Sequence, residues 1–191
     1  CEMNSTDCRD TDFSRSNLSY VRFELAKLCR ACLVESTCER TTFWTADLTE
    51  ANLSRANLSF TWFELAILHR ANLAGSTCRK ANFVKADLSE ADARKAVMVE
   101  ATFQGANLAL ARFDGANLQG ADLRDTDLSG TLFRGANLKD ANLDGAVLWE
   151  TNFAGADLEG ALVTATNIQI PQTYSSPAEF NAAQLQKKRA Q

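Results

Sequence analysis

The chain has 191 residues, of which 46% are hydrophobic and 23% are charged, and its formal net charge is −4. This length fits one domain with a tail, and no stretch is long and apolar enough to span a bilayer, so we expect no membrane span. The charge lacks the basic excess typical of nucleic-acid-binding surfaces, so we also expect no direct binding of nucleic acid.

Apolar residues recur at every fifth position from Met3 to Ile168, without a change of register. In the 34 pentads of residues 1–170, the centre is Leu seventeen times and Phe nine times. The residue two before the centre is Ala, Ser or Thr in all but two pentads. Helices repeat every 3.6 residues and strands every two, so a period of five indicates a short strand followed by a two-residue corner.

The spacing of the largest core side chains predicts that four pentads close one coil of 20 residues. We expect stacked ladders inside an all-β solenoid. The three ladders are Phe23, Phe43, Phe63, Phe83 and Phe103; Phe113, Phe133 and Phe153; and every twentieth Leu from Leu28 to Leu148.

All nine glycines occupy the second corner position, where a type II turn requires a positive φ. Eight of the nine follow residue 100. We therefore expect more type II corners in the later coils and less regular turns in the earlier ones.

Pentads such as Ala51-Asn52-Leu53, Ala116-Asn117-Leu118 and Ala121-Asp122-Leu123 resemble the pentapeptide-repeat family. The resemblance covers residues 1–170 and is stronger to cyanobacterial and organellar members than to the loop-bearing quinolone-resistance members. It implies a right-handed quadrilateral parallel β-helix. At four pentads to a coil, 34 pentads correspond to about 8.5 coils.

The pattern stops at Pro171, and residues 171–191 form a separate tail. Ser176 followed by Pro177 and Glu179 is a good helix start, so we expect a short helix to about Lys188 that covers the last coil.

The repeat already runs at Cys1, with no Met before it, and we expect the chain to be processed or cut from a longer protein. Cys1 is either a lipidated first residue or simply a small inward residue, and the second is favoured. The cytoplasm is the favoured compartment, with the thylakoid lumen, the periplasm and a lipid-anchored form as alternatives.

Most of the six cysteines fit the repeat. Cys8, Cys38 and Cys78 occupy core centres, while Cys29 and Cys32 face outward across one corner. A redox or zinc role for this outward pair is the alternative to two free surface thiols, which we favour. His69 is the only histidine and faces outward. We therefore expect no enzyme, no metal site and no cofactor.

Outward apolar residues are the informative departures from the pattern. Trp44, Trp62 and Val84 should share one outer face in consecutive coils, with four further residues at its corners. We call these seven residues the aromatic face: Trp44, Trp62, Val84, Phe60, Leu65, Tyr20 and Leu25. Residues 11–48 match residues 51–88 at 20 of 38 positions, so duplication of a two-coil unit is the alternative to a docking surface.

Two functions compete. The first is a non-enzymatic scaffold that binds a protein partner, or a second copy of the chain in a homodimer, through the aromatic face. The second is implied by the resemblance: some family members mimic DNA and protect DNA gyrase or another topoisomerase. Residues 101–170 carry nine acidic and four basic side chains, and we expect the mimicking face to be Asp122, Asp127, Asp140 and Asp157.

Overall fold

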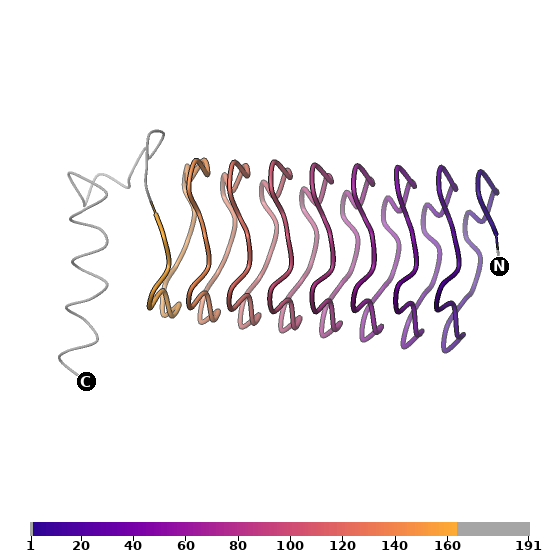
Figure 1. Ribbon diagram of the computed structural model, residues 1–191, viewed down its shortest axis with the longest axis horizontal. Coiled ribbons are helices and arrows are strands. Elements are labelled where there is room, and N and C mark those ends of the chain that lie inside the picture. The colour runs from indigo at the N-terminus through magenta and orange to yellow at the C-terminus, as the bar shows by residue number, and fades with distance from the viewer. Residues whose placement is uncertain (1, 164–191) are drawn as a thin grey trace.

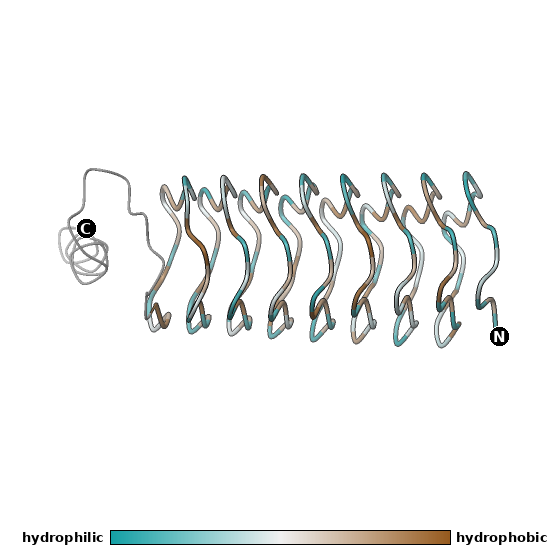
Figure 2. Ribbon diagram, turned by 90° about the horizontal axis from the view of Figure 1, so that it is seen from above, coloured by the Kyte–Doolittle hydropathy of each residue, from teal (hydrophilic) through white to brown (hydrophobic). Residues whose placement is uncertain are grey.

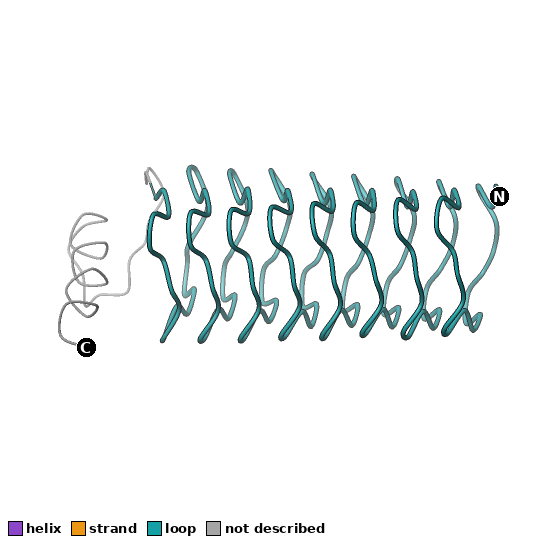
Figure 3. Cartoon of the chain, turned by 60° about the horizontal axis from the view of Figure 1, so that its bottom comes forward, coloured by secondary structure: helices purple, strands orange, loops and turns teal. Residues whose placement is uncertain are grey.

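The computed structural model describes residues 2–163, which form a rod of stacked coils (Figure 1). Parallel bridges join each bridge residue to the residue twenty positions later, from Glu2 with Arg22 to Asn142 with Leu162. Between residues 2 and 163 there is no helix, and strand pairing is limited to single bridge residues between turns (Figure 3). A coil therefore has twenty residues and a corner every five, as the ladders predicted.

Four expectations remain untested. Cys1 and the capping helix expected in residues 171–191 lie outside the described part of the chain. The right-handed sense of the coil and the count of about 8.5 coils stay predictions. Among residues 2–163, no helix has the length and apolar character that crossing a membrane requires.

The backbone amides of one pentad show why the coils stack. Two of its five N–H groups donate to carbonyl oxygens of the following coil, and one donates to a carbonyl oxygen of the preceding coil. The fourth donates to a carbonyl oxygen across the corner, and the fifth donates to a side-chain oxygen. In the pentad of residues 52–56 the bonds are Leu53 N to Asn72 O at 2.7 Å, Arg55 N to Ala74 O at 3.0 Å, Asn52 N to Ala31 O at 2.9 Å, Ala56 N to Leu53 O at 3.2 Å and Ser54 N to Asn52 Oδ1 at 3.1 Å.

This pattern explains two preferences of the sequence. One N–H in each pentad has no backbone acceptor, and the side chain of the Asn or Asp before the centre accepts its hydrogen bond. Asn72 does this for the N–H of Ala74 at 3.0 Å. The small residue before it points into the core. The buried hydroxyls of Thr41, Thr61, Thr131 and Thr151 donate to a carbonyl of the preceding coil, as Thr61 does to Cys38 O at 2.8 Å, whereas Thr126 donates to Leu123 O three residues earlier.

The corners are more uniform than the glycines predicted. The second corner residue has a positive φ throughout residues 5–160, whether it is Glu50 at 57°, Arg70 at 55° or Gly160 at 71°. Early corners also carry the same closing bond as late ones. The expectation of less regular early turns is therefore wrong, because the ladder bonds on both sides of each corner hold even β-branched and charged residues in the left-handed region.

The interior is filled by the ladders. Phe63 lies parallel to Phe43 and Phe83, with ring centroids 5.1 and 4.8 Å away. The ladder runs from Phe23 to Phe103 with every ring fully buried. The second Phe ladder is stacked as well, and both predictions are confirmed.

The cysteine positions also follow the prediction. Cys8, Cys38 and Cys78 are buried, whereas Cys29 and Cys32 are half-buried, and these five thiols are free. Burial raises the pKa of Cys38 to about 11 and that of Cys78 to about 12. Burial, followed by a hydrogen bond with Asp47, also raises the pKa of Cys29.

We predict that Phe63→Ala lowers the free energy of unfolding by about 3–5 kcal/mol, because it leaves a cavity in a filled ladder. The matched control is Phe60→Ala, three residues earlier at an exposed corner, which should cost less than about 1 kcal/mol. Urea unfolding followed by circular dichroism measures both. Equal losses in the two variants would show that the ladder contributes no special packing.

We predict that a maleimide labels Cys29 and Cys32 in the native protein and leaves Cys38 and Cys78 unmodified. The two core thiols are fully buried and stay protonated at neutral pH, and a thiolate is the reactive form. Mass spectrometry of peptides after timed labelling gives the rates, with urea-unfolded protein as the control. Fast native labelling of Cys38 would contradict the inward assignment.

Candidate functional site

Two tryptophans lie on the outside of the solenoid in adjacent coils. Trp62 occupies a bridge position between Thr42 and Asn82, and Trp44 lies in the preceding coil, where Trp62 O accepts the N–H of residue 43. The exposed fractions are 52% for Trp62 and 41% for Trp44, and Val84 is half-buried. The exposure expected for both indoles is therefore present.

Trp62 occupies a position where the repeat favours Asn or Asp. In the next coil, Asn82 Oδ1 accepts the N–H of Val84 at 2.9 Å, and an indole cannot accept such a bond. Trp62 therefore gives up a backbone-capping hydrogen bond and also exposes a large apolar surface.

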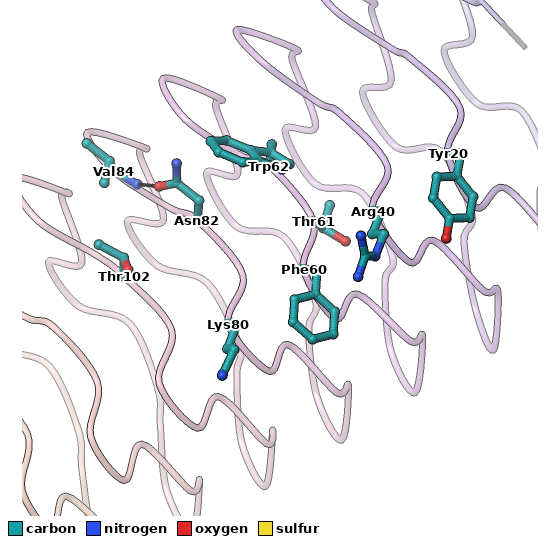
Figure 4. A pocket seen from close by; sticks show the side chains of 9 residues that line it. All are labelled: Tyr20, Arg40, Phe60, Thr61, Trp62, Lys80, Asn82, Val84 and Thr102. Carbon is teal, nitrogen blue, oxygen red and sulfur yellow. Dashed lines mark hydrogen bonds between the residues drawn. The ribbon is translucent and has the colours of Figure 1, made fainter.

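An open depression of about 620 Å³ lies beside Trp62 (Figure 4). Its walls come from five successive coils, from Tyr20 to Thr102. The ribbon coloured by hydropathy shows that polar and apolar residues follow one another at short intervals within each coil (Figure 2). The lining residues are Tyr20, Arg40, Phe60, Thr61, Trp62, Lys80, Asn82, Val84 and Thr102.

One edge of the depression is a single corner repeated in four coils. Tyr20, Arg40, Phe60 and Lys80 are each twenty residues apart, and the guanidinium carbon of Arg40 lies 5.2 Å from the centroid of the Phe60 ring. The Lys80 ammonium pairs with Glu100 at 3.2 Å. Sequence reasoning missed Arg40 and Lys80, although the period of twenty that aligned the core ladders also aligns these corner residues.

The structure gathers only part of the aromatic face around the depression. Tyr20, Phe60, Trp62 and Val84 line it, whereas Trp44, Leu25 and Leu65 do not. Leu25 and Leu65 occupy the corner on the other side of the same face and are 58% and 42% exposed.

The four carboxylates expected to mimic DNA do not share a face. Asp122 bridges residue 142, Asp127 bridges residue 147 and Asp157 bridges residue 137, so these three occupy different sides of the coil. Asp140 is a corner residue. The prediction of one acidic face is wrong in this respect, because Asp122, Asp127 and Asp157 belong to three different bridge columns of the twenty-residue coil.

Two of these carboxylates are also paired. Asp122 lies 2.6 Å from Arg124, whose hydrogen bond holds the pKa of Asp122 below its usual value. Asp157 lies 3.4 Å from Lys139. Neighbouring cations therefore reduce the negative potential that a DNA mimic needs.

The remaining polar candidates are pairs on the surface. His69 Nδ1 lies 2.9 Å from the Ser89 hydroxyl, a contact that sequence reasoning missed although the two are twenty residues apart. Neither residue lines the depression. In the described residues 2–163, no three His, Cys, Asp or Glu side chains are placed to hold a metal ion together.

Comparison with known proteins agrees with this architecture. The family model described as pentapeptide repeats (8 copies) matches five overlapping stretches, residues 6–37, 31–70, 66–105, 96–135 and 131–169. Among curated proteins, none matches the sequence.

Several solved structures are similar. A trypsin-treated variant of QnrB1, a plasmid-mediated fluoroquinolone resistance protein, has a TM-score of 0.75 at 16% identity, covering 100% of this chain and 98% of that one. HetL, a regulator of heterocyst differentiation from the cyanobacterium Nostoc sp. strain PCC 7120, is 28% identical with a TM-score of 0.29, and 84% of each chain is covered. A thylakoid-lumen protein of Arabidopsis thaliana is 27% identical with a TM-score of 0.33, covering 64% of this chain and 68% of that one.

The five-residue period, the bridges twenty residues apart and the family model that spans residues 6–169 lead to one conclusion. The chain belongs to the pentapeptide-repeat family.

Proposed function

We propose that this protein is a non-enzymatic scaffold that binds a partner protein through the aromatic face. The observation that carries the proposal is the exposure of Trp62 and Trp44 on one side of a solenoid whose core is already filled. Covering an exposed aromatic side chain stabilises a complex by roughly 1.5–3 kcal/mol. A partner that buries both indoles therefore gains affinity directly.

The composition of the depression supports the same function. Tryptophan, tyrosine and arginine are the residues most enriched among the energetically dominant positions of protein interfaces, and the depression has one of each in Trp62, Tyr20 and Arg40. A second copy of the chain is the alternative occupant, and the oligomeric state of the purified protein distinguishes it from a different partner.

Protection of DNA gyrase is the second candidate, and the structure favours it less. The similarity to QnrB1 at 16% identity shows the fold alone. A DNA mimic needs regularly spaced unpaired carboxylates on one side, whereas Asp122, Asp127 and Asp157 point to three different sides.

We predict that Trp44→Ala/Trp62→Ala abolishes capture of a partner from an extract of the cells that make the protein. The matched control is Trp149→Ala, which removes a third tryptophan that is 48% exposed on another side of the coil. Affinity capture with quantitative mass spectrometry measures the difference. A partner that the double variant retains as well as the control does would remove the aromatic face as the docking site.

We predict that the protein leaves DNA gyrase supercoiling, with and without a quinolone, unchanged at micromolar concentration. The reason is that its carboxylates are spread around the coil and two of those expected to act are paired. The assay compares wild type with a variant in which Asp122, Asp127, Asp140 and Asp157 are all replaced by Asn. Inhibition or protection that this variant loses would instead support DNA mimicry.

A further inference from the structure

Arginines in this protein are almost all neutralised by a carboxylate. Of the twelve arginines between residues 2 and 163, ten lie within 4.0 Å of an Asp or Glu oxygen. The two that have no such partner in the described chain are Arg40 and Arg79. Both are exposed.

These two arginines belong to the same part of the surface. Arg40 lines the depression and lies over the Phe60 ring at 5.2 Å. Arg79 precedes Lys80, another lining residue, and the Arg79 carbonyl accepts the N–H of Phe60 at 2.8 Å. No carboxylate lines the depression. Within residues 2–163, the two arginines without a carboxylate partner are thus a residue that lines the depression, Arg40, and a residue next to its lining, Arg79.

We propose that the depression binds an acidic segment of a partner protein, with an apolar side chain of the segment against Trp62 and Val84 and its carboxylates beside Arg40 and Arg79. This inference rests on the proposed docking function and names the chemistry of the partner. Guanidinium groups form charge-assisted hydrogen bonds with carboxylates, and the apolar wall provides the area that makes such a contact more than a weak surface ion pair.

The surrounding charges favour an acidic peptide over a nucleic acid. Glu39 precedes Arg40, Glu64 follows Trp62 by two residues on the same face, and Glu100 pairs with Lys80 from the next coil. A continuous phosphate backbone would meet these carboxylates, whereas a peptide can present one or two charges at the arginines only. A nucleic-acid-binding surface needs a continuous basic track, which this face lacks.

The test begins with a phage-displayed library of random dodecapeptides selected on the intact protein. We expect the enriched peptides to combine Asp or Glu with Trp, Phe or Leu. A fluorescein-labelled synthetic copy of the leading peptide is then titrated by fluorescence anisotropy. Recovery of no peptide, or of peptides without an acidic excess, would overturn the proposal.

Charge-reversed variants locate the contact. Arg40→Glu/Arg79→Glu should weaken binding of the peptide about tenfold or more, since each attraction becomes a repulsion. Glu is tolerated at the corner position of Arg40, because Glu50 and Glu90 occupy equivalent corners with the same positive φ. The matched control is Lys95→Glu, at a corner in another column, which should leave the affinity unchanged.

Comparing peptide binding by two variants distinguishes a failure of this inference from a failure of the proposed function. If Trp62→Ala abolishes peptide binding and Arg40→Glu/Arg79→Glu does not, the docking face stands and the acidic chemistry is wrong. If neither variant matters, both are wrong. Binding of a fluorescein-labelled oligo(dT) that matches or exceeds that of the peptide would assign the depression to nucleic acid and overturn the proposal.

Discussion

The structure depends on one backbone interaction, the hydrogen bond from each central residue to the following coil. Leu53 N donates to Asn72 O at 2.7 Å, nineteen positions later, and the same offset recurs from Met3 onward. Because the offset is constant, residues twenty apart lie in one column, inside or outside the coil. The core ladders, the corner columns and the depression beside Trp62 are all consequences of this register.

The register is strong enough to impose an unfavourable backbone conformation at every corner. Within residues 2–163, twenty-three residues other than glycine have a positive φ, which costs about 1–2 kcal/mol for a residue with a Cβ. The ladder bonds on either side of each corner, together with the filled interior, offset that cost. Many residue types can therefore occupy the corner, where the side chain projects outward. Corners are therefore the positions where this fold can vary its surface without changing its core, and Arg40 and Phe60 illustrate this.

The residues that depart from the repeat, and on which the proposed function rests, therefore lie on the outer surface. In most coils the position before the centre is polar and caps a neighbouring amide, as Asn72 and Asn82 do. Trp62 departs from that use at the centre of a face whose corner also carries an arginine without a carboxylate partner. Apolar area and unneutralised positive charge coincide there, and the proposed docking of an acidic segment rests on this coincidence.

The sequence by itself determined the repeat, the twenty-residue coil, the Phe ladder from Phe23 to Phe103 and the outward direction of Trp44 and Trp62. It could do so because a period of five and a period of twenty are both visible in the residue types. Only the tertiary structure showed that charged residues such as Glu50 adopt the same left-handed corner as glycine, because that conformation is held by bonds to other coils. The tertiary structure also decided which charges meet. It paired Asp122 with Arg124 two residues later and left Arg40 over Phe60 in the next coil. The repeat brings these residues close together, but the orientation of each side chain decides which groups meet.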